Sequence, residues 1–118
     1  MPHTTEHAIS HEMRTCIENC LDCYAICIET KAYCTSFGGK HVEAHHLQTL
    51  ADCAHLCETS ANFMLRGSEL HKDVCRICAD ACDRCADSCE QVDRNDDVMR
   101  KCVDECRKCA ESCREMAA

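Results

Sequence analysis

The chain has 118 residues, 16 of them cysteine, and its 21 acidic against 13 basic residues give a formal net charge of −8 at pH 7. This balance argues against nucleic acid as a partner, because phosphate binding needs clustered Lys and Arg. The N-terminal stretch has no basic region followed by an apolar one, and nothing later approaches the roughly 18 apolar residues of a membrane helix, so we expect a cytoplasmic protein without a membrane partner.

The chain is poor in large apolar residues and rich in cysteine. Leu, Ile, Val and Phe together number only 18, about 15% of the chain, whereas cysteine alone makes up about 14%. The length suits one domain, so we expect residues 1–118 to form a single unit with a sulfur-lined core. In a reducing cytoplasm, dense cysteine is typical of metal-binding or catalytic proteins rather than of disulfide-bonded ones.

The first predicted helix spans about residues 5–36 and carries two neighbouring stripes. Its cysteines recur at intervals of four, three, four and seven residues, which keeps them on one helical face, and the skipped position is Thr30. This thiol stripe consists of Cys16, Cys20, Cys23, Cys27 and Cys34. A second stripe, expected to pack against neighbouring helices, consists of Ile17, Leu21, Tyr24 and Ile28. Gly38 and Gly39 are expected to end the helix.

The second predicted helix, about residues 41–66, contributes the least sulfur. Cys53 and Cys57 lie one turn apart, and the same face continues backward to His46 and forward to Ser60 and Met64. Like Thr30, Ser60 stands where this face could hold another thiol.

The third predicted helix, about residues 69–92, holds the densest cysteine run, CRICADACDRCADSC. Its thiols, again spaced three and four apart, are Cys75, Cys78, Cys82, Cys85 and Cys89. Ser68 is expected to cap its N-terminus. A second apolar stripe consists of Leu70, Val74, Ile77 and Ala81. A coiled-coil seam normally carries Leu or Ile at such inward positions, so packing alone does not explain the thiols.

The fourth predicted helix, about residues 96–116, follows a polar turn in which Asn95 or Asp96 can act as N-cap. Its thiols are Cys102, Cys106, Cys109 and Cys113, flanked on the same face by Met99 and Met116. Short connections between long helices favour antiparallel neighbours. The sequence therefore predicts an all-α protein, an antiparallel up-down-up-down four-helix bundle with a cysteine-lined core.

The spacing favours metal binding over disulfides. Side chains three or four residues apart on a helix have Cβ atoms about 5–6 Å apart, whereas a disulfide needs about 3.5–4.5 Å. A few buried cysteines could serve simply as small apolar residues, but branched aliphatic residues normally fill whole stripes of this kind.

The softness of the thiolate ligands and the charge of the core indicate which metal the protein binds. Clustered thiolates select Cu(I), zinc or iron–sulfur clusters, and the C-x-x-C-x-x-C run ending in Cys-Pro that marks many clusters is absent. Four tetrahedral Zn²⁺ ions on 16 thiolates would leave eight negative charges in the core, which is costly. Monovalent ions shared by bridging thiolates leave a nearly neutral core, so the pattern favours many Cu(I) ions.

Two alternatives to copper storage stay open at this point: a metallothionein-like sink for zinc or cadmium, and a thiol redox buffer. An enzyme is not expected. Cysteine catalysis needs one activated thiol beside a base and an orienting group, and no cysteine is set apart here, so no catalytic residue is predicted.

The cysteine steps CIENCLDCYAIC, CAHLC, CRICADACDRCADSC and CVDECRKCAESC resemble those of the cysteine-rich four-helix-bundle copper storage proteins, cytosolic type, over nearly the whole chain. This resemblance implies storage of multiple Cu(I) ions per protomer inside the bundle and assembly as a homotetramer. It also implies that all sixteen cysteines are the metal ligands. The levels of Thr30 and Ser60 are expected to bind less metal. The sequence indicates no donor or acceptor protein for the copper.

The two ends of the bundle are rival entrances for the metal. One would gather Met13, Met64, His71 and Met116, whose thioether and imidazole groups could pass Cu(I) inward. Alternatively, these methionines only fill the end of the bundle as flexible apolar side chains. The opposite end offers Cys34, His46, Cys89 and Met99. The remaining histidines considered, expected to be solvated, are His3, His7, His11, His41 and His45.

Overall fold

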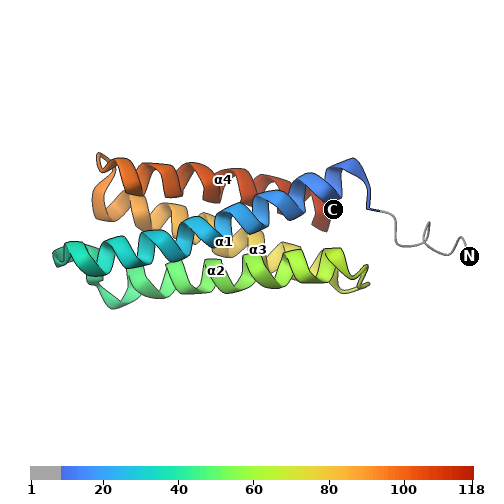
Figure 1. Ribbon diagram of the computed structural model, residues 1–118, viewed down its shortest axis with the longest axis horizontal. Coiled ribbons are helices and arrows are strands. Elements are labelled where there is room, and N and C mark those ends of the chain that lie inside the picture. The colour runs from blue at the N-terminus through green and yellow to red at the C-terminus, as the bar shows by residue number, and fades with distance from the viewer. Residues whose placement is uncertain (1–8) are drawn as a thin grey trace, which may run out of the picture.

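The computed structural model describes residues 9–118, which form four long α-helices, one short 3-10 helix and no β-strand within that range (Figure 1). The elements are α1 (His11–Phe37), η2 (Gly39–Val42), α2 (Ala44–Leu65), α3 (His71–Asp93) and α4 (Asp97–Ala117). The predicted all-α class with four helices and a cysteine core is confirmed. None of the helices in the described range is both long and apolar enough to cross a membrane.

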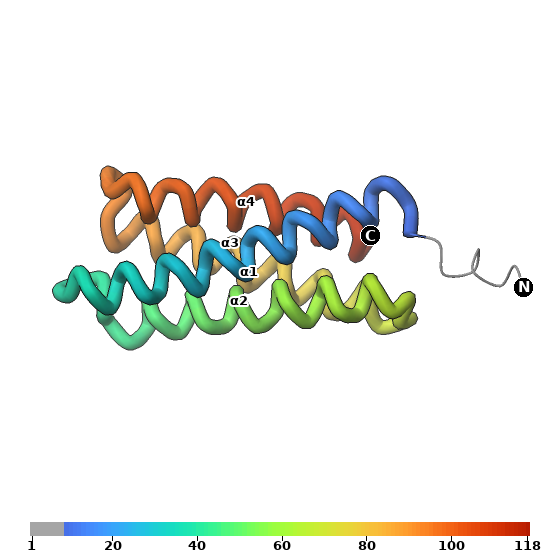
Figure 2. The backbone as a smooth tube through the Cα atoms, viewed as in Figure 1, coloured from blue at the N-terminus to red at the C-terminus, as the bar shows by residue number. Residues whose placement is uncertain are grey.

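Consecutive helices lie side by side and run in opposite directions, as the tube in Figure 2 shows. Helix α1 packs against α2 and α4, and α3 packs against the same two helices. Cys16, near the start of α1, contacts Cys113 near the end of α4. Cys34, near the end of α1, contacts Met99 near the start of α4. These two contacts fix the antiparallel register of α1 and α4.

Helix α1 starts later than expected. The predicted start near residue 5 falls outside the described residues, but the helix begins only at His11 because Ser10 has an extended backbone and caps it. The Ser10 hydroxyl accepts a hydrogen bond from the Met13 backbone N–H at 3.1 Å, satisfying one donor that the first turn leaves free. At the other end, Gly38 has φ +84° and its N–H donates to the Cys34 carbonyl. The predicted glycine stop is confirmed.

The second helix is shorter than predicted because its expected first residues belong to a separate turn. Gly39, with φ +61°, lets the chain reverse into η2, and Glu43 has an extended backbone that separates η2 from α2. His41, expected to be solvated, is only 4% exposed: its ring stacks on Phe37 with centroids 3.9 Å apart. His45 on α2 is exposed, as expected.

The turns before α3 and α4 use their polar residues differently. Ser68 is not the N-cap of α3, because the helix begins at His71; its hydroxyl instead accepts from the Leu70 N–H within the turn. Asp96 is the N-cap of α4, as predicted, and one carboxylate oxygen accepts from the N–H groups of Val98 and Met99 at 2.8 and 3.2 Å.

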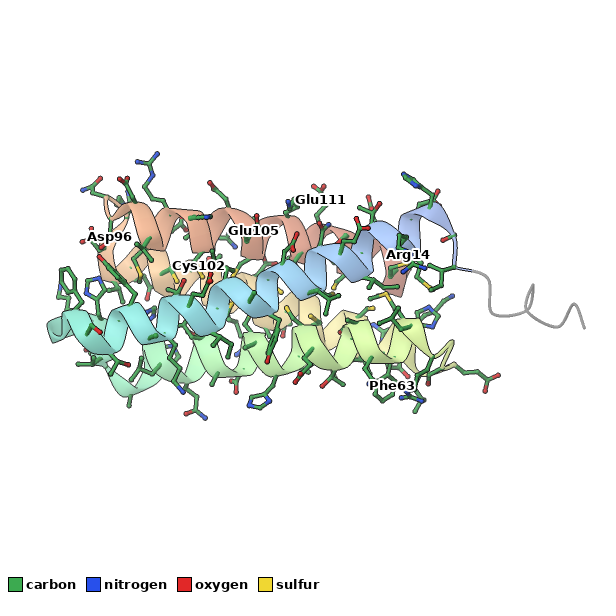
Figure 3. All side chains as sticks on the ribbon, viewed as in Figure 1. Arg14, Phe63, Asp96, Cys102, Glu105 and Glu111 are labelled. Carbon is green, nitrogen blue, oxygen red and sulfur yellow. The ribbon has the colours of Figure 1, made fainter. Side chains whose placement is uncertain are left out.

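The thiol stripes fill the interior, and Figure 3 shows sulfur atoms between the helices. Half of the residues of the second apolar stripes are exposed instead. All sixteen cysteines are 0% exposed. Ile17 is buried, but Leu21 and Ile28 are 44% and 48% exposed, and Ile77 on α3 is 57% exposed. The expectation that the second stripe of α1 packs against neighbouring helices is therefore wrong for Leu21 and Ile28, whereas Tyr24 is partly buried against the core. A position one residue from the inward stripe is turned by about 100°, toward the outer edge of the helix contact.

Ion pairs hold the outer edge of α3 against α4. Arg107 lies 3.0 Å from Asp83, 2.7 Å from Asp87 and 3.1 Å from Glu90, and Arg114 lies 2.6 Å from Asp83. Burial alone would raise the pKa of Asp83, but hydrogen bonds from Arg114 and Arg107 hold it below its usual value. Asp83 and Asp87 therefore join α3 to α4.

Candidate metal centre

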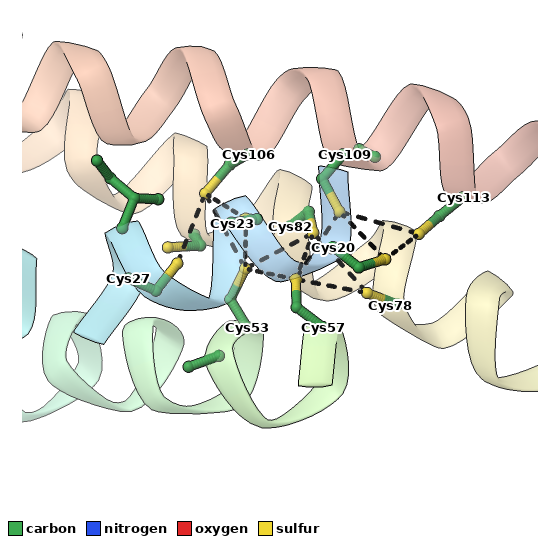
Figure 4. Packing of buried hydrophobic residues seen from close by; sticks show 14 of the residues in the cluster. Cys20, Cys23, Cys27, Cys53, Cys57, Cys78, Cys82, Cys106, Cys109 and Cys113 are labelled. Atoms are coloured by element: carbon green, nitrogen blue, oxygen red, sulfur yellow. Dashed lines mark hydrogen bonds between the residues drawn. The ribbon is translucent and has the colours of Figure 1, made fainter. Parts of the chain in front are cut away.

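The sixteen cysteines all lie within the described residues, and all are free thiols. Because each helix turns its cysteines inward at intervals of three or four residues, the sulfur atoms of four helices meet along one line (Figure 4). We call this arrangement the thiol core.

The contacts around Cys53 on α2 show how the helices meet. Its Sγ lies 3.7 Å from that of Cys23 on α1, 3.6 Å from Cys82 on α3 and 4.0 Å from Cys106 on α4. One turn further along α2, Cys57 Sγ lies 3.7 Å from Cys82 and 3.8 Å from Cys109. Every helix therefore contributes sulfur at the same level.

The sulfurs fall into quartets whose members lie within 4.8 Å of one another. Five of them are Cys20, Cys78, Cys109 and Cys113; Cys23, Cys53, Cys57 and Cys82; Cys23, Cys27, Cys53 and Cys106; Cys27, Cys85, Cys102 and Cys106; and Cys57, Cys78, Cys82 and Cys109. Several cysteines belong to two quartets. The quartets overlap, so neighbouring metal ions would have to share thiolates as bridging ligands.

The sulfur separations of 3.6–4.0 Å suit metal ligands and not disulfides. A disulfide bond is about 2.05 Å long, so forming one would require a backbone or rotamer shift. A metal bound at about 2.3 Å from each of two sulfurs this far apart would subtend an S–metal–S angle of roughly 100–120°. That range covers trigonal and tetrahedral coordination by thiolates.

Close packing distributes the protons of the thiol core unevenly. Hydrogen bonds with Cys109 and Cys20 raise the pKa of Cys57, whereas hydrogen bonds from Cys106 and Cys27 lower that of Cys102. A thiolate in this core is stabilised by neighbouring S–H donors, and its neighbours are correspondingly harder to ionise. A bound cation would replace the shared protons.

Two interior positions carry hydroxyls in place of thiols. Thr30 on α1 and Ser60 on α2 are both 0% exposed, and neither hydroxyl has a hydrogen-bond partner within residues 9–118. The structure thus places both where their spacing predicted, in line with the thiol stripes.

One end of the bundle is formed by the C-terminus of α1 and the N-termini of α2 and α4. There the neighbours of the last thiol of α1 are an imidazole and a thioether. Cys34 Sγ lies 3.4 Å from His46 Nε2 and 3.7 Å from Met99 Sδ. Burial raises the pKa of Cys34 to about 11 and lowers that of His46 below its usual value, so both groups are uncharged at neutral pH. We call this group of three side chains the His46 end.

The predicted entrance residues all belong to the opposite end. Met64 is fully buried, while Met13 and Met116 are partly buried against the core. His71 is partly exposed, and its Nδ1–H donates to the Ser68 carbonyl at 2.9 Å; within the described part of the chain its Nε2 makes no hydrogen bond. Of the N-terminal histidines, His11 is exposed as expected. His3 and His7 lie outside the described residues.

Sequence reasoning missed Ser88. Its hydroxyl lies 2.8 Å from His46 Nδ1, and the side chain is buried on α3. Ser88 precedes Cys89 and therefore lies beside the thiol stripe; only its contact with His46 marks it.

A protein-family model described as "Copper storage protein" matches residues 9–118. A crystal structure of a Nitrosospira multiformis protein superposes with a TM-score of 0.83 at 48% identity, covering 90% of this chain and 94% of that one. The Cu(I)-bound copper storage protein BsCsp3 gives a TM-score of 0.84 at 30% identity, covering 92% and 100%. The structure of apo copper storage protein 3 from Bacillus subtilis gives a TM-score of 0.76 at 32% identity, covering 87% of this chain and 96% of that one.

A sequence relative, the uncharacterised cysteine-rich protein YhjQ of Bacillus subtilis, is 33% identical over 65 residues. The match covers 55% of this chain and 60% of that protein's length. Together with the thiol core, the family match over residues 9–118 shows that this chain belongs to the copper storage protein family.

Proposed function

We propose that the protein stores Cu(I), holding multiple ions per protomer inside the bundle on its cysteine thiolates. The observation that carries this proposal is the set of overlapping sulfur quartets contributed by all four helices. Sharing thiolates between neighbouring quartets lets the number of monovalent ions approach the number of sulfurs, which keeps the buried charge small. All sixteen cysteines are the proposed ligands.

The similarity to a Cu(I)-bound member of the family supports Cu(I) over zinc or cadmium. The family is one of storage proteins rather than enzymes. Keeping copper on buried thiolates would withhold a reactive ion from the cytoplasm, where we place the protein, and reserve it for later use.

We further propose that the protein assembles as a homotetramer. Leu21 and Ile28 on α1, Ile77 on α3 and Leu70 just before α3 are each 44–58% exposed, so apolar side chains of one protomer face solvent along two helices. Burying such side chains against another copy is favourable. Light scattering of the reduced protein would test this; a monomer at micromolar concentration would contradict it.

Copper is proposed to enter where Met13, Met64, His71 and Met116 lie. His71 is partly exposed, and its Nε2 has no hydrogen-bond partner among residues 9–118, so it could supply an exchangeable ligand at the end of the bundle where Met64 is buried. Replacing Met64 and His71 with alanine should slow loading without lowering the final copper content. An unchanged loading rate would favour the opposite end.

The test of storage itself is an anaerobic titration of the reduced, full-length protein with Cu(I) against a competing chelator, repeated with Zn²⁺. Storage predicts that many Cu(I) equivalents outcompete the chelator. One to four tightly held zinc ions, preferred over copper, would instead support the metallothionein-like alternative.

A further inference from the structure

The His46 end brings together three soft ligand atoms from three helices. Cys34 on α1, His46 on α2 and Met99 on α4 are 0%, 2% and 0% exposed. Cys34 Sγ lies 3.4 Å from His46 Nε2 and 3.7 Å from Met99 Sδ. The thiol core offers several thiols at each level, whereas here the neighbours of the thiol are an imidazole and a thioether.

A hydrogen bond at Nδ1 orients the His46 imidazole so that Nε2 can bind a metal ion. His46 Nδ1 lies 2.8 Å from the Ser88 hydroxyl, on the side of the ring opposite the sulfur. When Nδ1–H donates to that hydroxyl, Nε2 carries the lone pair and directs it at Cys34. Metal-binding histidines are commonly fixed in this way, through a hydrogen bond from the nitrogen that does not bind the metal.

We propose that Cys34 Sγ, His46 Nε2 and Met99 Sδ form a separate site for a single Cu(I) ion, with Ser88 as a positioning residue. This inference rests on the proposed Cu(I) function and extends it to a site of different ligand chemistry. As the copper–sulfur bond forms, the Cys34 thiol releases its proton to solvent, and copper stays Cu(I).

Charge and softness favour a monovalent soft ion at this place. One thiolate and one Cu(I) ion sum to zero charge, and the other two ligands are neutral, so the buried site needs no counter-ion. Thioether sulfur selects Cu(I) over the harder divalent ions. Because two of its three ligands are uncharged, this site should hold copper less tightly than the thiolate quartets and exchange it sooner.

The test follows the ring nitrogens of histidine by ¹⁵N NMR during anaerobic Cu(I) titration of the reduced, full-length protein. We expect the His46 Nε2 resonance to shift late in the titration, after the thiolate-to-copper ultraviolet absorption of the core has nearly reached its limit. His46→Gln should remove that shift and lower the copper content by one ion. Met99→Leu should lower the affinity for the last-bound Cu(I) ion about tenfold, and Ser88→Ala should lower this affinity by a smaller factor.

A matched control lies elsewhere on the same helix. His55→Gln changes an exposed histidine of α2 to which no role in copper binding is assigned. This variant should leave the His46 shift and the copper content unchanged. If circular dichroism shows that His46→Gln does not fold, the NMR titration of the wild-type protein still tests whether His46 Nε2 binds Cu(I).

The two proposals fail in different ways. A core that fills with Cu(I) while the His46 resonance stays fixed and His46→Gln keeps its full copper content would overturn this site and leave storage intact. A protein that binds no Cu(I) would overturn both.

Discussion

The middle of the bundle and its His46 end bury the same soft elements but surround each sulfur differently. In the middle, Cys53 and Cys57 contact thiols of the other three helices. At the His46 end, Cys34 has an imidazole and a thioether. The difference shows that four similar stripes can create two ligand environments, because helix ends place non-cysteine residues on the inward face.

Among the substitutions proposed here, removing the two thiols of α2 should lower the Cu(I) content of the middle of the bundle most. Cys53→Ser with Cys57→Ser takes away the only cysteines of α2, which belong to at least three quartets. We expect the Cu(I) content to fall by two or more ions, measured by anaerobic titration, with the His46 end still able to bind. Serine is nearly isosteric, so circular dichroism should show an intact bundle. An unchanged copper content would mean that the quartets do not hold the metal.

Metal loading should stabilise the bundle strongly, and mostly through the middle. A ligand at 100 times its dissociation constant contributes about 2.7 kcal/mol per site to the free energy of unfolding. Several sites that tie four helices together should therefore raise the melting temperature by more than about 10 °C. Anaerobic calorimetry at increasing copper should show most of the rise before the last equivalent. A melting temperature that does not change with copper would show that copper binding does not stabilise the fold.

Adding a thiol to the middle should extend it by one ligand. Ser60 is fully buried in line with Cys53 and Cys57, and its hydroxyl has no partner within the described residues. Ser60→Cys should raise the copper content by about one ion and, by removing an unsatisfied hydroxyl, stabilise the apo protein by about 1 kcal/mol.

Thr59→Cys is the matched control for that substitution. Thr59 is the preceding residue, and its hydroxyl already donates to the His55 carbonyl. The control should add no copper to the bundle interior. Equal gains from both variants would show that any added thiol binds metal, wherever it lies.

The smallest expected effect is on the pH dependence of the apo protein. Burial lowers the pKa of His46, so the unfolded chain takes up the proton first and stability falls as pH drops below about 6.5. Burial raises the pKa of Cys34 from 9.0 to about 11, so the unfolded chain loses its proton first and stability falls as pH rises from 9 to 11. Melting temperatures in reducing buffer should form a plateau between these limits.

His46→Gln should remove the acidic limb of that plateau and leave the alkaline limb in place. A melting temperature that stays constant from pH 5 to pH 10.5 would show that neither group loses solvation on folding.

The thiol core could be predicted from sequence because it depends only on helical periodicity. The intervals between Cys75 and Cys89 allow one inward face, and the structure buries every one of those sulfurs. The meeting of Cys34, His46 and Met99 was also foreseen as one end of the bundle. Their contact distances depend on the axial offset between helices, which the turns at Gly39 and Asp96 set.

The exposed stripes could not be predicted in the same way. Leu21 and Ile28 are apolar and regularly spaced, which is the pattern of a buried face. Periodicity reports that residues share a face but not what covers it, and in one protomer the inward position was already taken by the thiols. The role of Ser88 was missed because a single serine beside a cysteine stripe has no spacing signal.

The overlap of the sulfur quartets has a consequence for how the protein fills. Cys57 belongs to one quartet with Cys23 and Cys53 and to another with Cys78 and Cys109. An ion in the first quartet therefore fixes the orientation of a ligand that the second needs, and each occupied position alters the affinity of the next along the row. Filling should resemble adsorption on a one-dimensional lattice with nearest-neighbour coupling, and the isotherm should not break into independent steps of equal size.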